Sequence, residues 1–313
     1  MKKIRMNCTA TLDETFADFL LSRRAKGLAE KTLESYSSQW KAVARHLDTG
    51  TDIAALQKAD LDDMIVSMQD AGLSPNSINS YTRVLKSFFS WCNEQGLTRL
   101  NIPLYKAEET VKGTYSDAEL TALLKKPDIR KTTFAEYQDW VIINFLLNCG
   151  SRAATVRAIQ IRDVDLDGGV VFYRHTKNRK AQVIPLCSPM IAILREYGRY
   201  RGGEPTDYLF CTETGTQLTE NGLRQSIARY NTRRGVQKTS IHLFRHTFAR
   251  KYLIDCGGDA FTLQKLLGHS ALAMTKHYCA IYDADLTKNY DNFSPLAQMK
   301  AGGAKIKMPA KGR

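Results

Sequence analysis

His242, Arg245, Arg152 and His269 have side chains that bind anions, and their spacing suggests one common site. His242 and Arg245 are three residues apart in IHLFRHTFARKYL, so on a helix they would project from one face. A guanidinium makes a two-pronged contact with phosphate oxygens, and an imidazole adds a further contact. Arg152 follows Gly150, where an apolar helix is expected to end, and His269 follows a second glycine break. Side chains in such turns can be aimed at a bound group.

A tyrosine and a lysine add reactive groups to this set. Tyr278 follows His269 by nine residues, on what the pattern predicts to be the next helix. Lys177 lies between two β-branched segments that predict a hairpin, and Lys180 is close enough to take its place. One natural use of the set is a reaction in which the arginines neutralise a phosphodiester and the phenol attacks it.

A metal site is less well supported by the same residues. His242 and His246 have the spacing of H-E-x-x-H zinc sites, but Leu243 stands where the catalytic glutamate would be. The seven cysteines are scattered without a C-x-x-C pair, which argues against a zinc ribbon and a disulfide framework. We therefore expect no metal and no cofactor, and we expect His246 and His277 to be structural.

The charge of the chain indicates a polyanionic partner. Its 313 residues include 45 Lys and Arg against 32 Asp and Glu, a net charge of +13. Residues 1–100 have a net charge of +1, residues 116–290 of +8 and residues 291–313 of +4. An excess concentrated in one large region is typical of polyanion binding, although charge alone does not choose between DNA, RNA and anionic lipid.

The elements that must position these residues begin with a predicted helical bundle. Apolar residues recur at helical spacing, and glycines or prolines mark the helix ends. The predicted helices run from Leu12 to Ala25, from Glu30 to His46, from an N-cap at Asp60 to Gln69, and from Ser74-Pro75 to Trp91.

Three basic residues of this bundle are candidates for contacts to phosphates. Lys31, Arg83 and Lys86 lie on the second and fourth helices, among Ser, Thr and Asn side chains that also bind phosphate oxygens. An ordinary solvated helix face explains the same pattern, so both interpretations stay open on the bundle's own residues.

The rest of the chain predicts a second domain that is mainly α with one small β-sheet. Residues 98–115 have no periodicity and predict a linker. Ser116 begins a helix, with Glu119 at the capping-box position. The hairpin follows Gly150, and the chain is mainly helical after Pro189. No apolar run approaches a membrane span and the start has no signal peptide, so we expect a cytoplasmic protein without a membrane partner.

Taken in order, the residues resemble those of the tyrosine recombinase, or phage integrase, family. The resemblance covers nearly the whole chain and also extends to R-D-V-D-L after the first arginine and V-I-P-L after the hairpin. The matching motifs are G-S-R at Arg152, H-T-K-N-R-K with Lys177, H-L-F-R at His242 and Arg245, L-L-G-H at His269 and H-Y at Tyr278.

The resemblance implies a domain organisation like that of two-domain, Xer-like recombinases. It implies a SAM-like four-helix core-binding domain over residues 9–97, a linker over 98–115, a mixed α/β catalytic domain over 116–290 and a tail over 291–313. The two domains would close around duplex DNA as a C-shaped clamp. Two positions depart from the family pattern: Ser151 replaces the usual Leu or Met, and Thr155 replaces an acidic residue that often supports the first arginine.

The resemblance also implies a reaction without metal or ATP. Tyr278 would attack the scissile phosphate, form a 3′-phosphotyrosyl link and release a 5′-hydroxyl. Arg152 and Arg245 would hold the non-bridging oxygens in the transition state. The other implied roles are acceptance of the phenol proton by His242, protonation of the leaving oxygen by Lys177 and a hydrogen bond to the phosphate from His269.

The implied partners are DNA sites with inverted repeats and further copies of this chain. The apolar spacing in residues 285–299 predicts that this segment packs on protein, and the family docks it on a neighbouring protomer, giving a tetramer on two duplexes. A type IB topoisomerase-like enzyme and a catalytically inactive DNA-binding regulator are the alternatives. The sequence does not specify the DNA site, or whether the reaction integrates, excises, inverts or resolves. The resemblance also implies that the protein is located in the bacterial cytoplasm and associates with the nucleoid during the reaction.

Overall fold

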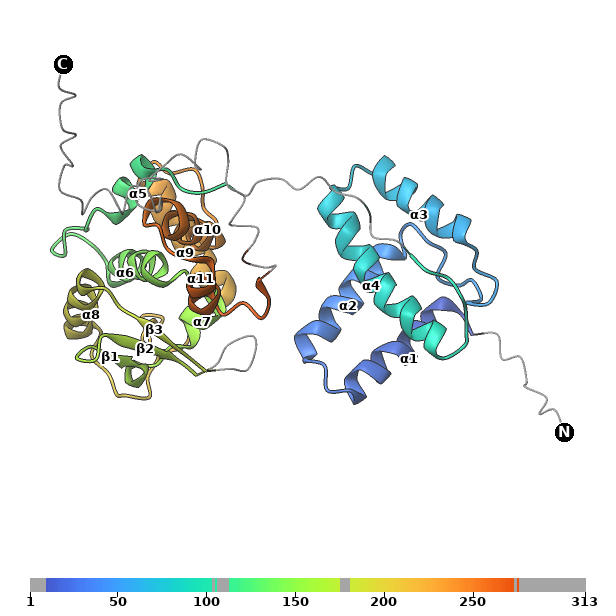
Figure 1. Ribbon diagram of the computed structural model, residues 1–313, viewed down its shortest axis with the longest axis horizontal. Coiled ribbons are helices and arrows are strands. Elements are labelled where there is room, and N and C mark those ends of the chain that lie inside the picture. Colours follow the sequence, from blue (N-terminus) through green and yellow to red (C-terminus); the bar gives the residue numbers. More distant parts are fainter. Residues whose placement is uncertain (1–9, 103–104, 106–112, 175–180, 273–274, 276–313) are drawn as a thin grey trace, which may run out of the picture. The chain divides into compact units, whose positions relative to one another are not determined.

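The computed structural model describes residues 10–102, 105, 113–174, 181–272 and 275 (Figure 1). The chain divides into two compact units, Met1–Thr110 and Val111–Arg313. Lys177, Lys180, Tyr278 and residues 285–299 lie outside the described residues.

Helical packing around aromatic side chains forms the described part of the first unit. Its helices are α1 (Leu12–Ala25), α2 (Glu30–Val43), α3 (Lys58–Asp70) and α4 (Pro75–Glu94). Phe16 stacks on Trp40 with ring centroids 4.0 Å apart, and the ring of Phe88 meets both edge-on. The four predicted helices are thus confirmed, with the predicted apolar faces turned towards one core.

Four helix ends differ from the prediction, one of them by a single residue, since α3 ends at Asp70 rather than Gln69. The second helix stops at Val43 rather than His46, because the next three residues form a turn. Asp60 is not the N-cap of α3; Gln57 is, and Asp60 accepts its backbone N–H over 2.7 Å from the third helical position. The fourth helix continues past Trp91 to Glu94.

The second unit is mainly helical with a small antiparallel sheet. Its α-helices are α5 (Asp117–Leu124), α6 (Phe134–Cys149), α7 (Ala153–Ala158), α8 (Ser188–Arg201), α9 (Glu220–Arg233), α10 (Ile241–Arg250) and α11 (Ala260–Leu267). A short 3₁₀ helix, η1 (Ile161–Asp163), and a short π-helix, η2 (Lys251–Asp255), complete the described helical elements. The described strands are β1 (Val164–Asp165), β2 (Val170–Tyr173) and β3 (Gln182–Pro185), in the order β1-β2-β3. The predicted hairpin is β2–β3, whereas β1 was not predicted.

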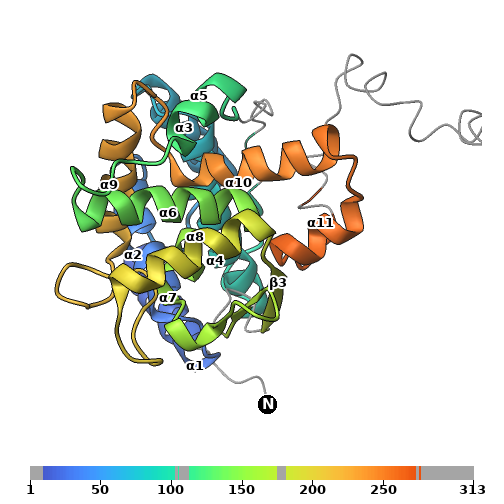
Figure 2. The same cartoon turned by 90° about the vertical axis from the view of Figure 1, so that its left-hand side faces the viewer.

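Helix α6 is the centre of this unit. It packs against α8, α9 and α10, and Figure 2 shows α10 running beside it. Ten of its residues are buried, as expected for a helix that is apolar on nearly every face. The sheet lies along the lower edge of the unit in Figure 1. The ends of α6 and α11 lie next to α10, where Arg245 donates to a carbonyl oxygen of each.

The segment between the domains contributes to both cores at its ends. Ile102 is buried against the helices of the first unit. Tyr115 is buried in the second, where its backbone N–H donates to Oγ1 of Thr247 on α10 over 2.9 Å. The division between Thr110 and Val111 falls between these two anchors. Among the described helices, none combines the length and the apolar character that crossing a bilayer would require.

Candidate active site

A glycine turn at the end of α6 brings three helices together. Gly150 has a φ of +60°, which favours glycine. A Cβ here would lie 2.4 Å from Cδ1 of Phe248 on α10 and 2.8 Å from Cδ2 of Leu267 on α11. A side chain at Gly150 would therefore require Phe248 and Leu267 to shift, in addition to the strained backbone. The turn leads directly to Arg152, which is the N-cap residue of α7.

Arg245 is buried beside this turn, with only 2% of its surface exposed. Its Nη1 donates to the carbonyl oxygen of Gly150 and its Nη2 donates to that of Leu267, both over 2.9 Å. These carbonyls end α6 and α11, and the C-terminal ends of helices favour cations. The helix ends therefore fix the guanidinium in the turn that precedes Arg152.

His269 is fixed next to Arg245 by both ring nitrogens. Nη2 of Arg245 lies 2.7 Å from Nε2 of His269, and Oγ1 of Thr275 lies 2.8 Å from its Nδ1. A guanidinium can only donate, so Nε2 accepts and Nδ1 carries the proton. The imidazole is neutral in this arrangement, and it is an acceptor towards Arg245.

The surroundings of His269 favour this neutral form. Burial is the main cause that lowers its pKa, followed by the charges of Arg245 and Arg152, and the pKa is about 4. The charge of Arg152 is thus the smallest of the three causes that favour the neutral imidazole. In the parts of the chain that the structure describes, the side chain of Arg152 makes no hydrogen bond and is half-buried.

His242 and His246 lie on successive turns of α10. Their ring centroids are 4.7 Å apart and the ring planes are nearly perpendicular, at 87°. His242 is exposed, whereas His246 is buried. No group of three or more possible metal-binding side chains occurs within the described residues.

The structure thus brings Arg152, Arg245 and His269 together and places His242 one turn before Arg245 on α10. Lys177 and Tyr278 fall in segments outside the described residues. Thr275 was not singled out from the sequence, because its contact with His269, six residues away, follows no helical or strand period. Thr275 is fully buried.

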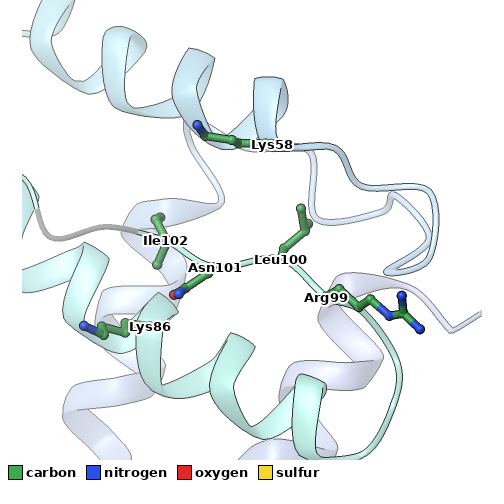
Figure 3. Close-up of a pocket in the computed structure, with 6 residues that line it drawn as sticks. All are labelled: Lys58, Lys86, Arg99, Leu100, Asn101 and Ile102. Carbon is green, nitrogen blue, oxygen red and sulfur yellow. The ribbon is translucent and has the colours of Figure 1, made fainter.

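The basic residues predicted on the first unit are all exposed. Lys31 lies on α2, and Arg83 and Lys86 lie on α4. Lys86 also lines a cavity of about 430 Å³ where α3 and α4 flank the chain that follows α4 (Figure 3). The cavity adds two cationic side chains that the sequence analysis missed, because they are distant in the chain: Lys58 and Arg99.

Both units match known protein families. Residues 116–285 match the phage integrase family, and residues 14–96 match the phage integrase, N-terminal SAM-like domain. Tyrosine recombinase XerD of Staphylococcus haemolyticus is 27% identical over 299 residues, which cover 92% of this chain and 99% of that protein.

Solved structures show the same fold. The Tn1549 transposon integrase in complex with a circular intermediate DNA has a TM-score of 0.76 and 20% identity, covering 93% of this chain and 99% of that one. A lambda integrase tetramer bound to a Holliday junction has a TM-score of 0.71 and 17% identity, covering 88% and 80%. Both solved structures therefore share the fold of this chain.

Proposed function

This chain belongs to the phage integrase family of tyrosine recombinases, and we propose that it recombines DNA site-specifically through a 3′-phosphotyrosyl intermediate on Tyr278. The observation that carries the mechanism is the convergence of Arg152, Arg245 and His269 at the ends of α6 and α11. Hydrogen bonds hold Arg245 and His269, and together with Arg152 they form a cationic site that fits a phosphodiester better than a neutral substrate.

The arginines differ in how they would act. Arg245 is held by carbonyl oxygens before any DNA arrives, so little reorganisation is needed when charge builds on the phosphate. Arg152 lies next to this fixed group and would supply the second guanidinium. Together they would hold the non-bridging oxygens while the phenol attacks.

His269 has to change its proton state to donate to the phosphate. Its Nε2 accepts from Arg245 in the described arrangement, so donation there requires a proton on Nε2, either as a second proton or by transfer from Nδ1. A bound phosphate would favour that proton, because its negative charge opposes the effect of the two arginines on the pKa. We infer that His269 becomes protonated when DNA enters the site.

The remaining roles are assigned to residues on the same reaction path. His242, exposed on α10, would accept the phenol proton. Lys177, or Lys180 in its place, would protonate the departing 5′-oxygen. The bond energy would stay in the phosphotyrosyl link until a 5′-hydroxyl reverses the step, so we propose that no ATP is consumed. We also propose that the cationic side chains make a metal ion unnecessary.

DNA partners and assembly belong to the same proposal. The net charge of +8 over residues 116–290 and the exposed Lys31, Arg83 and Lys86 support contacts with duplex DNA. The C-shaped clamp, the inverted repeats and the domain limits 9–97, 98–115, 116–290 and 291–313 remain predictions. We place the reaction in the bacterial cytoplasm, at the nucleoid.

An apolar groove on the second unit supports assembly through the tail. The groove has a volume of about 560 Å³ between α5, α6 and η2, with apolar lining from Leu120, Leu124, Leu147, Phe248 and Tyr252. We propose that residues 285–299 of a neighbouring copy occupy it, because Leu286, Tyr290, Phe293 and Leu296 have near-helical spacing. Phe248 also contacts the Gly150 turn, so a docked tail would touch a residue beside the active site.

Covalent trapping tests the proposal. Full-length protein is incubated with nicked suicide DNA in excess chelator, and the adduct is mapped by mass spectrometry. We expect an adduct on Tyr278 that is lost in Tyr278→Phe. It should be kept in Tyr282→Phe, which changes the next tyrosine in the chain, four residues further on. An inactive regulator would give no adduct. Transfer of the trapped strand to a second duplex separates recombination from topoisomerase-like relaxation.

A further inference from the structure

The β2–β3 hairpin ends in a cross-strand pair whose two side chains contact the turns of the active site. Tyr173 and Gln182 are the last register partners of the described ladder. Residues directly opposite in an antiparallel pair extend to the same face of the sheet. Here that face meets the end of α6 on one side and the end of α11 on the other, and β3 lies beside α11 in Figure 2.

Tyr173 contacts the turn before Arg152. Its hydroxyl is buried and hydrogen-bonds to Oγ of Ser151, and Ser151 in turn lies 2.8 Å from Sγ of Cys149. The thiol of Cys149 donates to the carbonyl oxygen of Phe145 over 2.8 Å. With that proton used, Ser151 donates to Cys149 and Tyr173 donates to Ser151, so each proton has one acceptor.

Ser151 links Cys149 and Tyr173, because its hydroxyl hydrogen-bonds to both side chains. Burial raises the pKa of both Cys149 and Tyr173, so the thiol and the phenol keep their protons. A leucine or methionine at position 151 would have no hydroxyl to join them. In this chain the Ser151 hydroxyl is therefore matched to the hydroxyl of Tyr173 on β2.

Gln182 contacts the turn before His269. Its Nε2 donates to the carbonyl oxygen of Lys265 on α11 over 2.8 Å. A Cβ on Gly268 would lie 2.5 Å from Oε1 of Gln182, so the amide packs directly against this glycine. Gly268 has a φ of +62°, and His269 is the next residue. The amide thus braces the turn from which the imidazole extends.

We propose that Tyr173 and Gln182 are a pair of positioning residues, which hold the Arg152 turn and the His269 turn at a fixed separation on one face of the hairpin. The pair touches neither the phosphate nor the phenol; it acts through the two residues that do. This inference rests on the proposed function, since it matters only if Arg152 and His269 bind the phosphate.

The Tyr173 contact is tested by Tyr173→Phe, which keeps the ring and removes one hydroxyl. We expect single-turnover cleavage at saturating DNA to fall about tenfold, because a small misplacement of Arg152 weakens transition-state contacts. DNA affinity should stay within about twofold. In an Arg152→Lys background the same substitution should cause no further loss, since the residue it positions is already gone.

The control is Tyr230→Phe, which deletes an equally buried hydroxyl bonded to the Leu123 carbonyl at 2.9 Å, within the same unit. It should lower thermal stability about as much as Tyr173→Phe and leave cleavage within twofold of wild type. Ser151→Ala is the second variant, used if Tyr173→Phe does not fold, and it should give the same loss. Full-rate cleavage by Tyr173→Phe or by Ser151→Ala would overturn the proposal. A further loss of cleavage when Tyr173→Phe is added to Arg152→Lys would also overturn it.

The Gln182 contact is tested by Gln182→Met, which is similar in size and cannot donate. Cleavage should fall about fivefold, with no further loss in a His269→Ala background. Gln217→Met is the matched control, because Gln217 likewise donates to a backbone carbonyl, that of Arg157, at 3.1 Å. Equal cleavage rates for Gln182→Met and Gln217→Met would overturn the proposal that Gln182 is a positioning residue. Absence of any adduct in the wild-type protein would instead refute the proposed function.

Discussion

Arg245 and His269 form a hydrogen bond of 2.7 Å in which the arginine is the donor and the imidazole the acceptor. The bond joins a side chain that is always charged to one that is kept neutral first by burial and then by this charge. Two cationic groups would repel each other here before DNA binds. The site therefore holds its positive charge on the arginines and keeps the histidine as a group whose proton state responds to the phosphate.

The proton on His269 is predicted to sit on Nδ1 in the DNA-free protein. Thr275 accepts it, while Nε2 accepts from Arg245. Nitrogen-15 NMR of histidine-labelled protein should show one imidazole with this tautomer, titrating near pH 4 rather than near its ordinary value of 6.5. Because the unfolded state binds this proton more readily, the stability contributed by His269 should be present above about pH 6.5 and fall towards pH 4. A His269 resonance with the proton on Nε2 would contradict the assignment.

Arg245→Lys is predicted to lower both stability and activity. The buried guanidinium donates to two helix-terminal carbonyls, and one ammonium cannot reach both and His269. We expect a loss of about 2 kcal/mol in the free energy of unfolding and strand cleavage below detection. Chemical denaturation and adduct formation measure the two effects. An unchanged denaturation midpoint would mean that the carbonyl contacts contribute little to folding.

Arg152→Lys should separate the two effects. In the described residues the Arg152 side chain makes no hydrogen bond, so its replacement should leave the unfolding free energy within about 0.5 kcal/mol of wild type. Cleavage should fall by at least 100-fold, because a lysine keeps the charge but not the two-pronged contact. Gel-shift affinity should change little. Equal loss of binding and cleavage would make Arg152 a DNA-binding residue only.

Local chemistry explains why much of the fold could be predicted. Ser116 and Glu119 form the predicted capping box, and Gly150 ends α6 in the left-handed conformation, since both features depend on residues near in sequence. The prediction of Asp60 as the N-cap was wrong because Asp60 is the third residue of α3, where its carboxylate accepts the backbone N–H of the true N-cap, Gln57. Local rules place a residue near a helix end but do not choose between neighbouring positions.

Contacts between distant segments explain what the sequence could not provide. The spacing of Arg152, Arg245 and His269 identified the residues, but it did not indicate that helix-terminal carbonyls hold Arg245. Tyr173 and Ser151 are 22 residues apart and belong to different elements. Their pairing depends on how the hairpin packs on α6, which no periodicity records.

A buried carboxyl on α6 predicts a second pH effect on stability. Asp139 is 5% exposed and accepts a hydrogen bond of 2.7 Å from Ser226 on α9. Burial raises its pKa from 3.8 to about 7, so the folded state binds a proton that the unfolded state releases. Its contribution to stability should therefore decrease as pH rises from about 4 to 7, by an amount on the order of a few kcal/mol.

Asp139→Asn should remove that dependence. The amide keeps an acceptor for Ser226 and has no charge to bury, so the variant should be more stable than wild type at pH 7.5 and similar at pH 4.5. The difference between the two proteins, followed by thermal unfolding across this range, cancels the contributions of other groups. A constant difference at all pH values would show that Asp139 ionises normally.

Truncation after Ala284 is predicted to spare binding of one chain to one site and to abolish cooperative assembly on paired sites. We propose that residues beyond this point fill the apolar groove lined by Leu120, Leu124 and Phe248. Leu124→Lys, at the exposed side of the groove, should give the same defect in the full-length chain, because a charge there opposes burial of an apolar segment. Native gels on paired sites measure the assembly.

Mixing the two variants shows whether the tail acts between copies. A truncated chain keeps its groove and a Leu124→Lys chain keeps its tail, so each mixed pair has one intact contact. We expect the mixture to assemble on paired sites better than either variant alone. If the tail instead folds back on its own chain, neither partner can supply what the other lacks, and the mixture should behave as the average of the two. Assembly by the truncated chain alone would refute a role for the tail in either arrangement.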